Sequence, residues 1–198
     1  MKKIVFSMTM LLATAASYAQ TATQVLDKTA QKLTAKTGVK ADFKATTPQG
    51  SITGTIAVKG NKFMATTQHT KVWFDGKTQW TYMSRNDEVN VSSPKDSELQ
   101  SLNPYNFIKM YKKGYKSTMR KDGNNYVVHL TAELSAKKVQ ELFITVNSKT
   151  YSPTQVKMLQ GKKWTTFDIT NLKQEKLSDA AFRFNAKDFP TAEVIDLR

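Results

Sequence analysis

Apolar and polar residues alternate along most of this chain, which is the pattern of strands with one buried face. The alternation is most regular from Val39 to Ala45, where every second residue is Val, Ala or Phe. Residues 52–91 read as four strands in a row, separated by turns such as Asp75-Gly76-Lys77. Because Asp-Gly between apolar runs is a strong hairpin signal, consecutive strands are expected to pair in antiparallel fashion.

The second half of the chain shows the same pattern, with Lys121-Asp122-Gly123-Asn124 as one of its turns. We expect ten or eleven strands in a strongly curved antiparallel sheet, whose concave face can cover an apolar ligand. The predicted strand segments are 39–47, 52–58, 62–67, 71–74 with 78–83, 88–92, 115–120, 126–131, 139–147, 152–159, 164–172 and 193–197.

Two segments show helical spacing instead. In residues 22–36 the apolar residues from Val25 to Leu33 fall on one helical face, and Gly38 stands where a C-terminal cap is expected. In residues 94–113 apolar residues recur near helical spacing, and Pro104 divides the segment into two short helices. Both segments are expected to lie against the concave face. The predicted fold class is therefore mainly β with helices (α+β).

The first nineteen residues have the composition of a secretory signal peptide. Lys2-Lys3 precede the apolar run Ile4–Ala16, which is short for a bilayer span, and Ser17-Tyr18-Ala19 places small residues at a cleavage site. Cleavage is expected after Ala19, with export to the periplasm or beyond; an uncleaved anchor is the alternative. Since the chain contains no cysteine, it is not itself a lipoprotein and has no disulfides. Residues 20–198 are expected to form one domain.

The sequence carries no catalytic or metal-binding motif. Its two histidines, His69 and His129, lack metal-ligand spacing, and no nucleophile elbow or phosphate loop is present. Asp75 and Asp122 are better explained as turn residues. The large apolar residues of the strands therefore indicate binding, and we predict no enzymatic activity, no cofactor and no metal.

The formal net charge is +14, and lysines occur on almost every predicted strand. Such lysines are ordinary on the solvent face of a sheet, where they also prevent edge pairing. A denser basic group accompanies Tyr111 and Tyr115 and suits an anionic membrane surface or an acidic partner, whereas nucleic acid is not expected for an exported protein. This predicted docking patch comprises Lys109, Lys112, Lys113, Lys116, Arg120 and Lys121.

Three stretches in the expected order resemble the periplasmic outer-membrane lipoprotein carrier proteins (LolA). One is the hairpin Phe74-Asp75-Gly76-Lys77-Thr78-Gln79-Trp80-Thr81-Tyr82, and a second is residues 115–130, with Asp122-Gly123 at the turn. The third is Ala180-Ala181-Phe182-Arg183-Phe184, followed by Pro190 and Val194-Ile195-Asp196. The resemblance extends over the whole segment that follows the signal peptide.

The resemblance implies an incomplete antiparallel β-barrel, or half-barrel, covered by a short helical lid over an apolar cavity. It further implies a carrier that holds lipoprotein acyl chains and moves them from an inner-membrane donor to an outer-membrane acceptor; we expect a monomer. In the family an Arg-Pro follows the lysine of a strand-ending turn, and that Arg is linked to lid opening. Here Lys59 is followed by Gly60-Asn61, so the lid is expected to be held by apolar contacts.

The candidate site residues are alternate apolar residues of the strands and the Phe-rich end, together with the lid. Two alternatives stay open: a periplasmic lipid sensor with the same half-barrel, and an interaction domain with a filled core. The predicted cavity residues are Phe43, Ile56, Phe63, Trp80, Tyr82, Val91, Val128, Leu130, Phe143, Val156, Trp164, Phe182 and Phe184, and the predicted lid residues are Leu102, Phe107, Ile108 and Met110.

Overall fold

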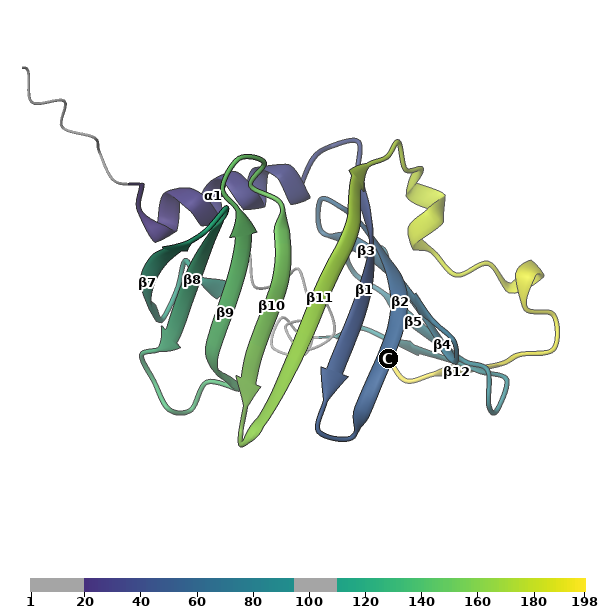
Figure 1. The fold of residues 1–198 in the computed structure, drawn as a ribbon. Coiled ribbons are helices and arrows are strands. Elements are labelled where there is room, and N and C mark those ends of the chain that lie inside the picture. Colours follow the sequence, from purple (N-terminus) through teal and green to yellow (C-terminus); the bar gives the residue numbers. More distant parts are fainter. Residues whose placement is uncertain (1–19, 95–109) are drawn as a thin grey trace, which may run out of the picture.

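The computed structural model describes residues 20–94 and 110–198, and Figure 1 shows its arrangement. One large sheet, antiparallel except for the pairing of β12 with β6, has the strand order β12-β6-β5-β4-β3-β2-β1-β11-β10-β9-β8-β7. Its strands are β1 (Val39–Thr47), β2 (Gly50–Lys59), β3 (Lys62–Thr67), β4 (Thr70–Phe74), β5 (Gln79–Met83), β6 (Glu88–Ser92), β7 (Tyr115–Asp122), β8 (Asn125–Ala132), β9 (Val139–Asn147), β10 (Pro153–Gln160), β11 (Lys163–Gln174) and β12 (Glu193–Asp196).

The two end strands of the sheet, β7 and β12, do not pair with each other, so the barrel is incomplete as predicted. Within the described ranges there are twelve strands rather than ten or eleven. The difference arises at the Asp75-Gly76 turn, which separates two complete strands, β4 and β5. Residues 52–91, which were expected to contain four strands, therefore belong to five. The last strand, β12, pairs parallel to β6 and forms the edge of the sheet opposite β7.

Helix α1 (Ala22–Leu33) begins with a capping box, in which Thr21 and Gln24 each accept a hydrogen bond from the backbone N–H of the other. The helix ends three residues before the predicted Lys36: the Thr34 N–H still bonds to the Ala30 carbonyl, but the Thr34 backbone, with φ of −98° and ψ of 18°, has left the helical conformation. Gly38 is therefore not its cap. It adopts a positive φ of 102° in the turn that leads into β1.

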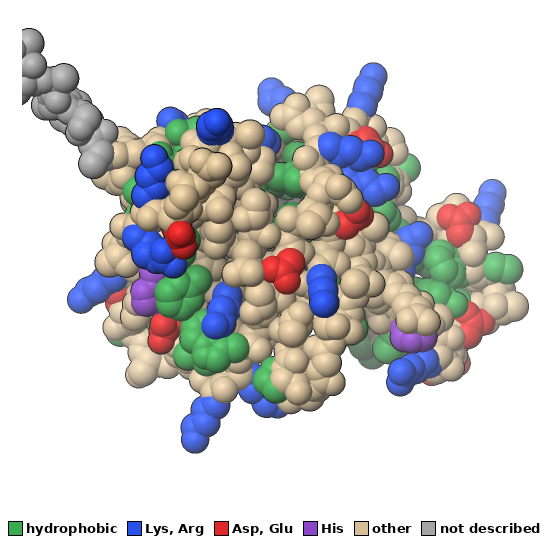
Figure 2. Space-filling model, in the orientation of Figure 1, with side chains coloured by type: hydrophobic (Ala, Val, Ile, Leu, Met, Phe, Trp, Pro, Cys, Tyr) green, Lys and Arg blue, Asp and Glu red, His purple; other side chains and the backbone are tan. Residues whose placement is uncertain are grey.

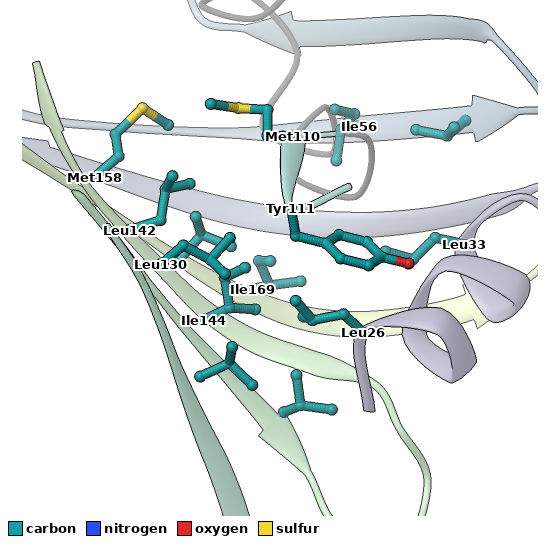
Figure 3. Packing of buried hydrophobic residues seen from close by; sticks show 14 of the residues in the cluster. Leu26, Leu33, Ile56, Met110, Tyr111, Leu130, Leu142, Ile144, Met158 and Ile169 are labelled. Atoms are coloured by element: carbon teal, nitrogen blue, oxygen red, sulfur yellow. The ribbon is translucent and has the colours of Figure 1, made fainter. Parts of the chain in front are cut away.

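One face of the sheet packs against α1, and we call it the inner face. In Figure 1 α1 passes behind β8, β9 and β10, so the viewer sees the opposite, outer face. Buried side chains from α1, from the inner face and from Met110 and Tyr111 form one continuous apolar cluster, part of which is drawn in Figure 3. Burial of each large apolar side chain contributes about 1.5–3 kcal/mol, so this cluster stabilises the domain without disulfides.

The chain after β11 crosses to the outer face of β3–β6. This C-terminal segment, residues 177–198, contains two short 3₁₀ helices, η2 (Asp179–Phe182) and η3 (Ala186–Asp188), and then β12. In Figure 1 the segment appears in yellow, on the side of the sheet away from α1 and beyond β2–β5.

Candidate functional site

The inner face carries apolar side chains in rows that run across neighbouring strands. Residues directly opposite one another in an antiparallel pair point to the same face. One row joins Val58 of β2, Phe63 of β3 and Phe74 of β4. A similar row on β8, β9 and β10 joins Val128, Ile144 and Val156, all without exposed surface. The inner face therefore offers apolar surface across most of the sheet.

Met110 and Tyr111 cover part of this face next to α1. Both side chains are buried, and in Figure 3 the ring of Tyr111 extends toward α1. The Tyr111 hydroxyl donates a hydrogen bond to Asp27 Oδ1 of α1, and the Lys112 ammonium lies 3.4 Å from the same oxygen. Residues 110–112 therefore contact α1 through polar as well as apolar side chains.

The Tyr111–Asp27 hydrogen bond changes the acidity of both groups. Chiefly this hydrogen bond, with a smaller contribution from Lys112, lowers the pKa of the Asp27 carboxyl. Burial, and then the bond to Asp27, raises the pKa of the Tyr111 phenol. Asp27 is thus ionised and Tyr111 neutral over the ordinary pH range, which keeps the donor and acceptor roles fixed.

The sheet register places six of the thirteen predicted cavity residues together on the inner face. All six are buried, and all belong to the apolar cluster that packs against α1. They are Phe43, Ile56, Phe63, Val128, Leu130 and Val156. Met110 is the one predicted lid residue within the described ranges, and it joins the same cluster. Leu102, Phe107 and Ile108 lie outside the described residues.

Five other predicted cavity residues lie on the outer face, so their placement on the concave side was wrong. In β5 and β6, Trp80 pairs with Trp73 and Val91, and Tyr82 pairs with Val89. These positions alternate with the inner residues Gln79 and Thr81. Since successive side chains of a strand point to opposite faces, choosing the apolar set in β5 and β6 selected the wrong face. The five are Trp80, Tyr82, Val91, Phe143 and Trp164.

The remaining two predicted cavity residues, Phe182 and Phe184, belong to the C-terminal segment. The Phe184 ring packs edge-on against Trp73, with centroids 5.6 Å apart, and Phe189 packs on both Trp73 and Tyr82. Phe182 is fully buried. These contacts explain why β4 and β5 have aromatic residues on the outer face: the C-terminal segment, and not a ligand, covers them.

Charged contacts fasten the C-terminal segment to the β2–β3 turn. Lys59 Nζ lies 3.0 Å from Asp179 Oδ1 and donates to the Leu177 carbonyl at 2.8 Å, and Lys62 Nζ lies 2.9 Å from Asp179 Oδ2. Hydrogen bonds from Lys62 and then Lys59 lower the pKa of Asp179. Lys59, after which the family's Arg is missing, therefore binds the chain terminus on the outer side of the sheet.

Outer-face residues of β8–β11 form a separate aromatic group. His129 stacks on Phe143 with centroids 4.1 Å apart, Phe143 lies 6.0 Å from Trp164, and Lys157 Nζ lies 4.6 Å from the Trp164 ring. Figure 2 looks onto this face, where apolar side chains gather beside a histidine over β8–β10. All of these rings are partly exposed, so Phe143 and Trp164 stabilise neighbouring strands from outside.

The predicted basic patch follows the free edge of the sheet. Lys112 and Lys113 precede β7, whereas Lys116, Arg120 and Lys121 lie on it, and all five are exposed. Arg120 is paired with Asp122 at 2.7 Å. The sixth predicted member, Lys109, lies outside the described residues. The structure thus places the described basic residues on one edge strand and the turn before it.

The described residues show no grouping of reactive side chains. His129 Nε2 lies 3.0 Å from Glu141 Oε2 on the outer face, and no third ligand completes a metal site in residues 20–94 and 110–198. No helix in those two ranges has the length and hydrophobicity needed to cross a membrane.

The polar inner residues of β5 and β6 were not predicted from the sequence. The only signal for them was the alternation of polar and aromatic residues in Gln79-Trp80-Thr81-Tyr82.

Two solved structures are similar to this chain. A solved structure of an uncharacterized conserved protein from Thermus thermophilus is similar with a TM-score of 0.61 at 12% identity, covering 87% of this chain and 97% of that one. A LolA superfamily protein from Nitrosomonas europaea is similar with a TM-score of 0.46 at 12% identity, covering 84% and 99%. The first of these similarities supports the fold.

None of the curated proteins matches the sequence. The profile of one protein family does match, over residues 12–162, and that family is described as outer membrane lipoprotein carrier protein LolA. The matched residues make up well over half of the chain and include α1 and every strand from β1 to β10. The chain therefore belongs to the LolA family of outer membrane lipoprotein carrier proteins.

Proposed function

We propose that this protein binds lipoprotein acyl chains on the inner face of its sheet and carries them through the periplasm to the outer membrane. The observation that supports this most strongly is the continuous apolar cluster on the inner face, in a chain that belongs to the LolA family. Export by a signal peptide cleaved after Ala19 is part of the proposal. So is transient contact with an inner-membrane donor and an outer-membrane acceptor.

The energetics of acyl chains make such a carrier necessary. Exposure of a chain to water costs about 0.8 kcal/mol per CH₂, so a lipoprotein does not cross an aqueous compartment unaided. Release must remain feasible as well, and reversible affinity reaches its practical limit near about −20 kcal/mol. An open sheet whose inner face is covered by α1, Met110 and Tyr111 exchanges apolar contacts within the protein for contacts with the chain. The net free energy of binding is then moderate, with no nucleotide or metal required.

The basic edge around β7 suits the docking step. Lys113, Lys116 and Lys121 have no carboxylate within ion-pair distance among the described residues. Positive side chains at a free edge attract an anionic lipid surface or an acidic partner protein. We propose that this edge approaches the membrane or the partner, while the inner face holds the chains.

The test begins with the full chain, expressed with its leader and purified from the exported fraction. Mass spectrometry of an organic extract should detect bound acyl species. A transfer assay then uses inner-membrane vesicles loaded with a triacylated lipopeptide and separate acceptor vesicles. The carrier proposal predicts lipopeptide first in the soluble fraction with the protein and then in the acceptor vesicles. Binding without delivery would contradict the carrier role and favour a lipid-sensing module.

A further inference from the structure

The inner face changes from apolar to polar between β4 and β5. The row of Val58, Phe63 and Phe74 continues into Gln79 of β5 and Ser92 of β6. A parallel row on the same face shows the same change, since Ile56, Ala65 and Val72 continue into Thr81 and Asn90. Both rows change from apolar to polar side chains between β4 and β5. The inner face is therefore apolar on β2–β4 and polar on β5 and β6.

Gln79 is the most buried member of this polar end. Only 7% of the residue is exposed, and its Nε2 donates to Thr81 Oγ1 at 3.2 Å. Its Oε1 is buried and accepts no hydrogen bond from any residue in the ranges 20–94 and 110–198. Buried side-chain oxygens are nearly always paired, because an unpaired one has lost its hydration without compensation. An amide oxygen is only an acceptor, so the partner that would satisfy it must be a donor.

The outer face does not account for these polar residues. Trp80 and Val91 occupy the outer positions of the same two strands, on the face where the C-terminal segment packs against Trp73 and Tyr82. The strands β5 and β6 therefore have apolar side chains directed away from the ligand face and polar ones directed toward it. This is the reverse of β8–β10, where the inner side chains are Val, Leu, Ile and Met.

We propose that Gln79, Thr81, Asn90 and Ser92 form a subsite for the polar head of an acylated ligand. In this subsite Gln79 Oε1 accepts a hydrogen bond from an amide N–H attached to an acyl chain. The chain then runs from β5 toward Phe74, Phe63 and Ile56, where both rows are apolar. The inference rests on the proposed function, and it adds an orientation for the ligand and a selectivity for N-acylated species.

Gln140 provides a matched control within the same protein. Its Oε1 is the other buried side-chain oxygen without a partner among the described residues. Gln140 lies in β9, where the register with β10 shifts between Leu159 and Gln160 and leaves it without an opposite residue. A backbone irregularity thus accounts for Gln140, whereas β5 pairs regularly with both neighbours around Gln79.

The experiment compares three palmitoyl ligands in competition with a fluorescent acyl probe bound to the full chain. N-palmitoylglycinamide has the amide N–H, methyl palmitate has no donor, and monopalmitoylglycerol offers hydroxyl donors. Wild type should bind the amide about two- to tenfold more tightly than the ester, the range that one net hydrogen bond supplies. In Gln79→Met this preference should disappear while ester binding persists. Gln140→Met should keep the preference.

The folding stability of Gln79→Met supplies a second readout. Because Oε1 has no hydrogen-bond partner among the described residues, its replacement by an apolar group should not lower the urea midpoint. Equal affinity for amide and ester in wild type, or an unchanged preference in Gln79→Met, would overturn the subsite and leave the proposed function intact. Tighter binding of monopalmitoylglycerol than of the amide would overturn the amide assignment. Failure of all three ligands and the probe to bind would overturn the proposed function, and the subsite with it.

Discussion

Gln79 and Trp80 follow each other in β5 and point to opposite faces of the sheet. Gln79 pairs with Phe74 on the inner face, whereas Trp80 pairs with Trp73 on the outer face. The tryptophan thus lies on the side of the sheet where the C-terminal segment packs, and the glutamine on the side where we propose that ligands bind. Successive residues of this hairpin therefore belong to opposite faces of the sheet and have different neighbours.

Replacement of Trp80 should therefore leave ligand binding unchanged. From the sequence, Trp80 was expected to line the cavity, so that Trp80→Glu would reduce the binding of an acyl probe. With Trp80 partly exposed on the outer face, we now expect a folded Trp80→Glu protein to bind the probe with wild-type affinity. Circular dichroism checks folding and fluorescence titration measures affinity. Loss of binding by a folded variant would show that Trp80 contributes to the ligand site.

Acid should loosen the C-terminal segment. Its contacts with Lys59 and Lys62 lower the pKa of Asp179 below the ordinary value. A group with a lowered folded-state pKa stabilises the folded state fully above its unfolded pKa, and the contribution is lost as the pH falls through the folded pKa. After correction for the intrinsic pH dependence of amide exchange, the protection factors of residues 177–198 should accordingly be constant near neutrality and fall below about pH 4.

Asp179→Asn is the control for the acid effect. It should show smaller protection factors for residues 177–198 already at neutral pH, and a smaller further decrease on acidification. High salt should act on the wild type in the same direction, because these ion pairs are partly exposed. Identical pH profiles for wild type and Asp179→Asn would show that Asp179 does not fasten the segment.

The hydrogen bond from Tyr111 to Asp27 should contribute to stability. Tyr111→Phe removes the donor but keeps the buried ring, so we expect the free energy of unfolding to fall by about 1 kcal/mol. This value is lower than that for a hydrogen bond to a fully buried charge, because Asp27 is partly exposed to solvent. A double-mutant cycle with Asp27→Ala in urea denaturation isolates the coupling. Strictly additive effects would mean that the contact contributes nothing.

The outer aromatic group should affect stability and not binding. Phe143→Ala removes the ring that stacks on His129 and approaches Trp164, so it should lower the free energy of unfolding by about 1 kcal/mol. Affinity for an acyl probe should remain that of wild type. A marked decrease in affinity would place the ligand on the outer face of β8–β11, contrary to the proposal.

Local alternation was sufficient to predict most strands, and β1, β3, β6 and β9 begin and end where it placed them. It also placed Phe43, Ile56 and Val128 on the inner face, because their strands have only one apolar side. Alternation did not identify the face in β5 and β6. There Phe189 packs on Tyr82 of β5, and Phe184 packs beside it on Trp73 of β4; both phenylalanines lie about a hundred residues further along the chain.

Contacts between distant residues account for the other differences. The bond between Asp27 and Tyr111 joins residues 84 positions apart, and the one between Lys59 and Leu177 joins residues 118 apart. Neither contact leaves a periodic signal in the sequence. For the same reason the polar subsite around Gln79 was not predicted: it becomes visible only when the cross-strand rows are aligned in the sheet.

Photocrosslinking locates the ligand most directly. The full-length protein is loaded with a triacylated lipopeptide that carries a diazirine near the end of one acyl chain, then irradiated, digested and analysed by peptide mass spectrometry. The proposal predicts crosslinks to inner-face residues such as Ile56, Phe63, Leu130 and Val156. Crosslinks confined to outer-face residues such as Phe143 and Trp164, or to the C-terminal segment, would contradict acyl-chain binding on the inner face.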